Sequence, residues 1–415
     1  MTRSGEDAPR SRWRFGPGLL VTAAFIGPGT VATASRAGGE FGFALLWGVV
    51  FAVVATVVLQ EMAARLGLVA RLGLAEAIGD SLRSPWARRA ALTLVVGAVV
   101  PGNTAYQTGN LIGSGVGVSL LTGLPADRVA AALGLGIAVL LACGATGRLV
   151  KHALIALVLA MSAALVATAV ASRPDPSEVV RGLLWPTLPS GSLMTVLALI
   201  GTTVVPYNLF LHATAVQDRW PAVGRVADDL RSARLDTAVS ITLGGVVTMA
   251  IVVTAAAAAG ASGGTPSAPH ELAEQLRPLL GPAGQTLFAA GLAAAGLTSA
   301  ITAPLAAGYA AAGALVRSGD AIQSARVARG TAAAVAGVGA AMAYFLGKSP
   351  SQTIVAAQAA NGLLLPLVAV FLLWVMNRRA LLGDYCNGWR LNLAGAIVVL
   401  VAIGLGVKSL LGLVA

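Results

Sequence analysis

Two short stretches of the sequence place helix-interrupting and hydroxyl-bearing residues inside long apolar runs. The first reads GPGT at 27–30, and the second reads TTVVPYN at 202–208. Glycine and proline interrupt helices, and an interrupted helix exposes backbone N–H and C=O groups. At membrane depth such groups are tolerated where they line a cavity or a ligand. The stretches therefore predict a binding site; the alternative is that they only permit kinks, with the threonines bonding back to their own helices.

A third set of polar side chains is expected beside this site. Asn103, Gln107 and Asn110 are spaced i, i+4 and i+7, so they share one face of a helix. Uncharged amides within a membrane helix usually face the interior of the bundle. They would either line the site or form hydrogen bonds between helices, and the spacing leaves both interpretations open. Three hydroxyl residues of a later segment are interpreted as packing groups: Thr298, Ser299 and Thr302.

One histidine lies inside a predicted helix. His212 follows Asn208 by four residues, so the two would share a helix face. Histidine changes its charge near neutral pH, which makes His212 a candidate proton relay. The sequence indicates no acidic partner within reach of its side chain, and a neutral hydrogen-bonding role is the alternative.

The acidic residues indicate which cargo such a site would suit. All 17 Asp and Glu residues can be placed away from the two interrupted stretches, with Glu61 at the end of the second apolar segment. Holding a dehydrated divalent cation at membrane depth with neutral ligands alone is costly. The N-termini of half-helices, in contrast, carry partial positive charge and free N–H groups that suit a carboxylate. A small organic solute, amino-acid-like or a small carboxylate, is therefore preferred; a partly hydrated Mn²⁺ or Mg²⁺ ion held by Thr, Asn, Gln and carbonyl oxygens is the alternative.

The elements that position these residues are membrane helices. Of the 415 residues, 57% are hydrophobic and 11% are charged, against about 25% charged in soluble domains. The N-terminal run is too long for a cleavable signal peptide. Apolar runs of this length are typical of membrane-spanning helices. Eleven such segments are predicted, at 16–36, 43–64, 91–117, 128–147, 153–172, 193–216, 237–260, 283–316, 328–346, 351–376 and 391–413.

The basic residues predict the orientation of the chain. If the N-terminus is cytoplasmic, 21 of the 28 Lys and Arg residues fall in cytoplasmic regions, as the positive-inside rule requires. The C-terminus would then lie on the opposite side of the cell membrane. The net charge of +11 is accordingly interpreted as a signal of topology and of contact with the lipid bilayer, and no nucleic-acid partner is expected.

The two interrupted segments occupy matching places in the chain. They are the first and the sixth, so segments 1–5 and 6–10 form two halves. Paired Gly/Pro-interrupted segments in corresponding positions are the best sequence indicator of an inverted-repeat transporter. We therefore expect one transmembrane domain over 1–415, with a first repeat at about 16–172, a second at about 193–376 and an extra helix at 391–413.

The chain resembles the NRAMP family of proton-coupled divalent-metal transporters over nearly its whole length. GPGLLVTAAFIGPGTVATASRAGGEFGFALLW, GTTVVPYNLFLHA and SQTIVAAQAANGLLLPLVAVFLL look like the first, sixth and tenth helices of that family. The resemblance implies an all-α LeuT-type fold, an inverted repeat of 5+5 helices with an eleventh helix, in which helices 1 and 6 are broken. It also implies alternating access, with segments 1, 2, 6 and 7 rocking against the rest.

The resemblance also assigns positions to the site. The family usually carries Asp-Pro-Gly-Asn in its first helix and Met-Pro-His-Asn in its sixth, where this chain has Gly27–Thr30 and Val205–Asn208. Gln358 matches a Gln that reaches the ion in that family, and His212 matches its second His. No residue of this chain is assigned as a metal ligand. The predicted substrate-binding residues are Gly27, Pro28, Gly29, Thr30, Gln107, Asn110, Thr202, Thr203, Val205, Tyr207, Asn208 and Gln358.

Other classes of function are less well supported. No GxxxxGK[ST] phosphate-binding loop is present, which argues against an ATP-driven pump and for secondary transport. No nucleophile–base pair is visible, so no enzyme activity and no cofactor are expected. Cys143 and Cys386 have no metal or redox spacing. We expect a monomer that uses H⁺ or Na⁺ as its coupling ion, and a membrane sensor that transports nothing is the remaining alternative.

Overall fold

A computed structural model of the chain describes residues 26–144, 148–220, 226–262, 281–316 and 320–414. Within these ranges the chain is helical, and no strand occurs. The helices are α2 (Pro28–Phe41), α3 (Leu46–Val69), α4 (Leu74–Asp80), α5 (Pro85–Thr122), α6 (Ala126–Cys143), α7 (Arg148–Ala171), α8 (Pro176–Leu184), α9 (Leu193–Thr203), α10 (Asn208–Arg219), α11 (Val226–Ser262), α14 (Pro282–Leu315), α15 (Ala321–Leu346), α16 (Pro350–Val375), α17 (Arg379–Leu382) and α18 (Trp389–Val414).

Many of these helices are long and apolar enough to cross a membrane. Nine candidate spans occur among the described residues, one of which runs through both α9 and α10. Each overlaps one of the predicted apolar segments, and this confirms the prediction of a multi-pass helical membrane protein. The third predicted segment, 91–117, forms part of α5, which is not among these nine spans. The first segment is described only from Ile26 onward, so its N-terminal part lies outside the described residues.

Several helices extend beyond the apolar segments or lie between them. α5 begins at Pro85 rather than at 91, because Ser84 caps it and Pro85 occupies its first turn. The segment between α7 and α9, which falls between two predicted apolar segments, contains α8, whose N-cap Asp175 accepts a hydrogen bond from the Ser177 N–H at 2.8 Å. Prediction from hydropathy missed α4 and α8 because both are too short to span a bilayer.

The second interruption lies where the sequence predicts it. α9 ends at Thr203, α10 begins at Asn208, and Val204–Tyr207 connect the two half-helices. Pro206 contributes no N–H group, so a continuous helix would lack one hydrogen bond at this point. Close to this connection, α2 begins at Pro28, with Gly27 as its N-cap, and packs on α9. Each of the two interruptions therefore places the N-terminus of a half-helix inside the bundle.

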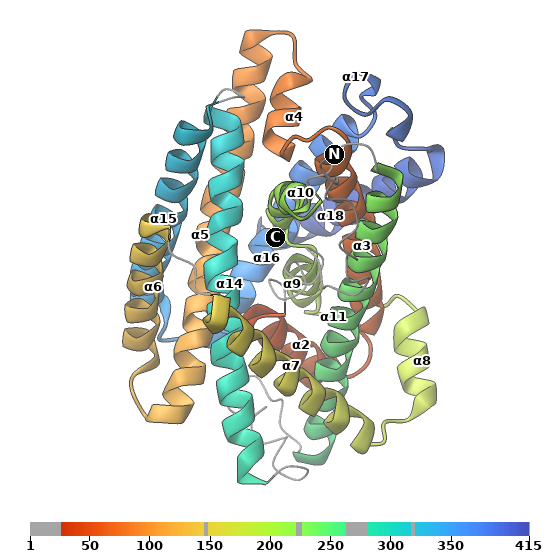
Figure 1. Cartoon of the computed structure of the whole chain (residues 1–415). Coiled ribbons are helices and arrows are strands. Elements are labelled where there is room, and N and C mark those ends of the chain that lie inside the picture. Colours follow the sequence, from red (N-terminus) through yellow and green to blue (C-terminus); the bar gives the residue numbers. More distant parts are fainter. Residues whose placement is uncertain (1–25, 145–147, 221–225, 263–280, 317–319, 415) are drawn as a thin grey trace, which may run out of the picture.

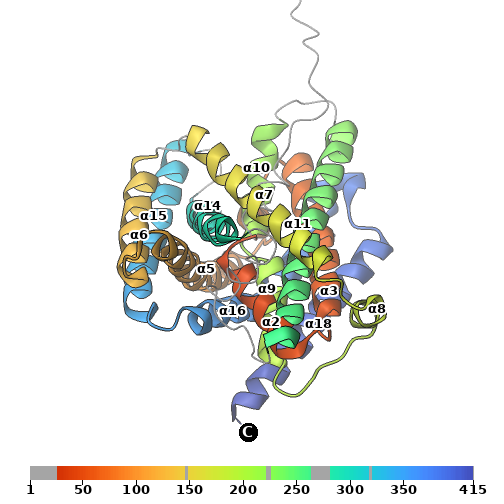
Figure 2. The same cartoon turned by 90° about the horizontal axis from the view of Figure 1, so that it is seen from below.

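The half-helices lie at the centre of the bundle. In both views α5 and α14 lie side by side, with α6 and α15 beyond them, while α3 and α11 lie on the other side of the central elements α2, α9 and α10 (Figures 1 and 2). α2 packs on α11, and α9 packs on α16. Glycines allow this close packing: a Cβ at Gly117 of α5 would overlap the α14 backbone at Ala289 and Ala293.

A cluster of charged side chains joins several elements at one end of the bundle. Glu61 of α3 pairs with Arg65 at 3.2 Å and with Arg234 of α11 at 2.9 Å. The Arg65 side chain is only 3% exposed, and it also donates to the Tyr385 carbonyl at 2.8 Å. Asn387 accepts a further hydrogen bond from Arg65. The cluster thus joins α3, α11 and the segment that precedes α18.

Candidate functional site

The start of α2 approaches three other helices closely. An added Cβ at Gly29 would overlap the Gln358 side-chain amide of α16. At Gly27 it would lie 2.9 Å from Ser299 Oγ of α14 and 3.7 Å from Asn110 Oδ1 of α5. A side chain at either glycine would displace the groups that now approach it. The structure therefore brings together Gly27, Gly29, Asn110 and Gln358, four of the predicted site residues, and adds Ser299, which the sequence analysis had assigned to packing.

Two amides at this point have no partner within the described part of the chain. Asn110 and Gln358 are both fully buried. Neither the nitrogen nor the oxygen of either side-chain amide has a hydrogen-bond partner among the described residues. A buried polar group without a partner typically costs about 1–3 kcal/mol, and most such groups in native proteins are satisfied. Two such amides beside Gly27 and Gly29 offer unused hydrogen-bonding groups that a polar ligand could satisfy.

The other two amides of α5 bind the neighbouring helix. Gln107 Nε2 donates to the Ala300 carbonyl of α14 at 3.0 Å, and Asn103 Nδ2 donates to the Ala303 carbonyl at 2.7 Å. Pro304 has no N–H, so the Ala300 carbonyl lacks its usual donor within α14, and Gln107 supplies one. The hydrogen bonds between helices that the spacing allowed are therefore present. The amide oxygens of both residues have no partner among the described residues.

The two interrupted segments meet through their threonines. Thr30 Oγ1 and Thr202 Oγ1 lie 3.0 Å apart, within hydrogen-bond distance, and both side chains are fully buried. Thr203 differs from its neighbour, since its hydroxyl donates to the Leu199 carbonyl of its own helix at 3.0 Å. Thr203 therefore forms the hydrogen bond to its own helix that was the alternative interpretation of the threonines. A direct contact between the interruptions involves Thr30 and Thr202.

Tyr207 forms an aromatic wall on the second interruption. Its side chain is buried, and its hydroxyl donates to Asn361 Oδ1 of α16 at 3.1 Å. Its ring packs against Tyr106 of α5, with the ring centroids 5.4 Å apart. The adjacent side chains of Val205 and Asn208 are buried as well. Asn361 and Tyr106 were not among the predicted site residues, because contacts between helices do not appear in the spacing of either helix.

His212 is bound to an amide rather than to an acid. Its Nδ1 lies 2.9 Å from Gln60 Oε1 of α3. An amide oxygen only accepts, so Nδ1 donates and the ring is held by a neutral partner. The other ring nitrogen has no partner among the described residues. His212 thus forms a hydrogen bond to a neutral side chain, which was the alternative role for this residue. Its role as a proton relay stays a prediction.

The described residues contain no group of three or more His, Cys, Asp or Glu side chains that could hold a metal ion. Around the half-helix ends, the polar atoms are amides and hydroxyls. The Glu61 carboxylate of α3 is engaged by two arginines at one end of the bundle. Chemically, this arrangement offers hydrogen-bond donors and acceptors without a formal charge.

Proteins that are similar in sequence carry the name divalent metal cation transporter. The family model described as natural resistance-associated macrophage protein-like matches residues 18–412. A divalent metal cation transporter MntH of Aeromonas hydrophila is 31% identical over 406 residues, covering 96% of this chain and 95% of the relative. The MntH of Yersinia enterocolitica is 30% identical over 404 residues, covering 96% and 95%.

Solved structures with the same architecture extend to other transporters. A manganese transporter of Eremococcus coleocola superposes with a TM-score of 0.74 at 22% identity, covering 98% of this chain and 88% of that one. MhsT in complex with L-phenylalanine gives a TM-score of 0.61 at 16% identity, covering 96% and 100%. These likenesses confirm the LeuT-type fold. With a family match over almost its whole length, the chain belongs to the Nramp family of membrane transporters.

Proposed function

We propose that this chain is a secondary active transporter whose cargo is a small polar organic solute, amino-acid-like or a small carboxylate. The observation that carries the proposal is the pair Asn110 and Gln358. Both are buried, and both offer an N–H donor and an oxygen acceptor that no described residue uses. A solute that both donates and accepts hydrogen bonds matches such groups, whereas a cation uses only their oxygens.

The residues at the family's metal positions support the same cargo. Where the family usually carries Asp, Asn and Met, this chain carries Gly27, Thr30 and Val205. None of these three side chains supplies a carboxylate or a sulfur ligand. Sulfur ligands favour soft transition metals, and carboxylate oxygens favour Mn²⁺. These three positions therefore lack the ligand types that select a metal ion. The fold itself accommodates organic molecules, since MhsT is in complex with L-phenylalanine.

The N-termini of the half-helices add a complementary feature. α2 begins at Pro28 and α10 begins at Asn208, so both present the positive ends of their dipoles within the bundle. A carboxylate group is stabilised at such an end. An amino-acid-like solute or a small carboxylate would place its carboxylate at the start of α2, where the amides of Asn110 and Gln358 also lie.

A partly hydrated divalent cation is the second candidate cargo. Four buried amide oxygens have no partner among the described residues: those of Asn103, Gln107, Asn110 and Gln358. Amide and water oxygens are ligands that Mg²⁺ and Mn²⁺ accept. The similar MntH proteins are named as divalent metal cation transporters. On this alternative, water molecules of the ion would donate to the amide oxygens.

Replacing Gln358 by glutamate distinguishes the two candidates. Gln358→Glu adds a negative charge at the site with almost no change in shape. A carboxylate-bearing solute would be repelled by it, and its affinity should fall by about tenfold or more; the affinity for Mn²⁺ or Mg²⁺ should rise. Calorimetry on the purified full-length protein measures both, after a thermal-shift screen of amino acids, small organic acids and divalent cations identifies a binder.

A control variant and a transport assay complete the test. Ser162 of α7 is buried and donates to its own helix, so Ser162→Ala should leave binding unchanged. Saturable Mn²⁺ binding that strengthens in Gln358→Glu, without binding of any organic solute, would contradict the proposal. Uptake into proteoliposomes under an imposed H⁺ or Na⁺ gradient identifies the coupling ion; binding without uptake under either gradient would indicate a sensor.

A further inference from the structure

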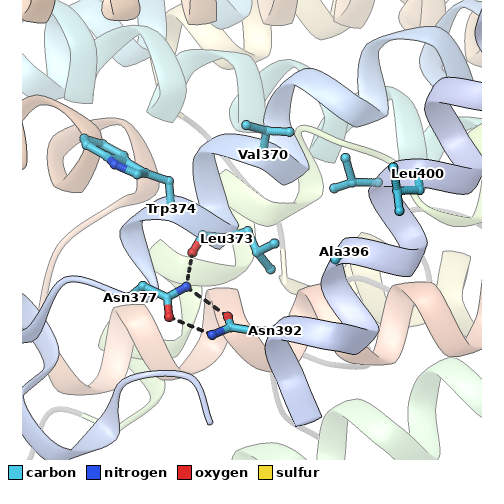
Figure 3. Close-up of a pocket in the computed structure, with 8 residues that line it drawn as sticks. Val370, Leu373, Trp374, Asn377, Asn392, Ala396 and Leu400 are labelled. Carbon is cyan, nitrogen blue, oxygen red and sulfur yellow. Dashed lines mark hydrogen bonds between the residues drawn. The ribbon is translucent and has the colours of Figure 1, made fainter. Parts of the chain in front are cut away.

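A groove opens between α16 and α18 on the outside of the bundle, away from the half-helices. It has a volume of about 530 Å³ and is shown in Figure 3. Its lining residues are Val370, Leu373, Trp374, Asn377, Asn392, Ala396, Val399 and Leu400. Both helices are candidate membrane spans by length and composition, so an outward-facing groove between them is expected to face the bilayer.

The groove is apolar along most of its length and polar at one end. Val370 and Leu400 are 48% and 66% exposed, as expected of side chains in contact with lipid chains. At the other end, Asn377 and Asn392 are joined by two hydrogen bonds, each donated by one amide to the oxygen of the other, at 2.9 and 2.8 Å. Figure 3 shows both amides at the same end of the groove. This change from apolar to polar matches the change from acyl chain to headgroup in a phospholipid.

Positive charge lies at the polar end of the groove. Arg378 follows Asn377 directly, and its guanidinium carbon lies 4.1 Å from the centroid of the Trp374 ring. Its Nε is buried and has no hydrogen-bond partner among the described residues. Arg379 and Arg390 are close in sequence to the same end, and none of the three forms an ion pair within the described part of the chain.

The surrounding acids do not neutralise this charge. Residues 376–392 contain three arginines and a single acid, Asp384. Trp374 holds the Arg378 guanidinium by a cation–π contact, which keeps it at the rim of the groove. The orientation predicted from the basic residues would put this end of the groove at the cytoplasmic leaflet, where anionic lipids attract basic residues by about 1 kcal/mol each.

We propose that the α16–α18 groove is a binding site for one anionic phospholipid. One acyl chain lies along the apolar wall of Val370, Val399 and Leu400. The phosphate lies at the end formed by Asn377 and Arg378. A zwitterionic phospholipid has the same chains but a compensating cation, so it binds more weakly.

Native mass spectrometry of the full-length protein in detergent tests this proposal, with phosphatidylglycerol and phosphatidylcholine as probes. The unmodified protein should retain one phosphatidylglycerol more tightly than phosphatidylcholine. Arg378→Gln should weaken phosphatidylglycerol retention by about fivefold, the loss expected for one basic contact. Ala396→Trp should fill the groove and displace both lipids. Arg326→Gln on α15, an exposed arginine without an ion pair in the described chain, should change neither.

Two results would overturn the proposal. The first is equal retention of the two lipids by the unmodified protein, because the groove would then select chains and not headgroups. The second is unchanged phosphatidylglycerol retention in both Arg378→Gln and Ala396→Trp. Size-exclusion profiles and unfolding temperatures of each variant show whether a loss of lipid reflects a loss of fold.

Discussion

At the scale of single residues, the site depends on glycines that admit side chains from other helices. Gly29 is the clearest example, because the Gln358 amide occupies the space in which a Cβ would lie. The amide is therefore positioned by the absence of a side chain on α2. Gln358 and Asn110 then present their unused polar atoms at the start of that helix.

Gly29→Ala should displace the Gln358 amide and weaken cargo binding. The overlap is expected to cost about 1–3 kcal/mol of stability as overpacking. Calorimetry and thermal unfolding measure the two effects. Gly97→Ala is the matched control, since an added Cβ on this exposed position of α5 meets nothing within 4 Å. Unchanged cargo affinity in Gly29→Ala would show that Gln358 does not contact the cargo.

Part of this site was predictable from residue types alone. Asn110 and Gln358 could be nominated because amides inside apolar segments face the bundle interior. The proximity of Ser299 to Gly27 and of Gln60 to His212 could not. Both pairs join separate helices, and their contact depends on the rotation of each helix about its axis. Small residues are spread over all faces of these helices, so the sequence does not show which face packs against which neighbour.

At the scale of elements, α14 is a continuous helix in which a neighbouring helix replaces one missing backbone hydrogen bond. Pro304 removes the donor for the Ala300 carbonyl, and Gln107 of α5 replaces it. The same amide thereby fixes α5 against α14. Its role in holding two helices together is independent of whether its oxygen also contacts cargo.

A double-mutant cycle tests whether Gln107 replaces the hydrogen bond that Pro304 removes. Gln107→Leu leaves the Ala300 carbonyl without a donor and should lower stability by about 1 kcal/mol. In a Pro304→Ala background, the backbone N–H of residue 304 can supply the donor, so the same Gln107→Leu change should cost less. Unfolding temperatures of the four proteins in one detergent give the coupling. Additive effects would mean that the two residues act separately.

Element boundaries were less predictable than element existence. Apolar runs located the membrane segments, but α5 extends back to Pro85 and α11 back to Val226, beyond the bilayer-sized runs. Hydropathy does not detect such polar extensions. Capping residues do: Ser84 before Pro85 and Asp175 before Pro176 each precede a proline that is suited to the first helical turn.

At the scale of the whole molecule, the Glu61 cluster joins elements that are distant in sequence. α3, α11 and residues 385–387 meet around the Glu61–Arg65 pair, and the Arg65 side chain is nearly inaccessible. An arginine in such a place needs its counter-charge, because removing one partner of a buried pair leaves an uncompensated charge.

Glu61→Gln should therefore destabilise the protein strongly, by about 3–5 kcal/mol. The exposed pair Arg36–Glu40, with side chains 34% and 28% exposed, provides the control. Glu40→Gln should cost less than about 1 kcal/mol. Thermal unfolding of both variants measures the contrast. Similar losses in the two would show that the hydrogen bonds to the segment before α18, rather than Glu61, hold Arg65.

The uncharged lining around Asn110 and Gln358 has a consequence for energetics in a living membrane. Moving one elementary charge through the membrane potential is worth about 2.3 kcal/mol per 100 mV. A carrier whose site adds no charge gains or loses that energy only through its cargo and its coupling ion. Reorientation with a zwitterion alone would be insensitive to voltage, whereas reorientation with Mn²⁺ would be driven inward by it. The voltage dependence of uptake thus reports directly on what the amides hold.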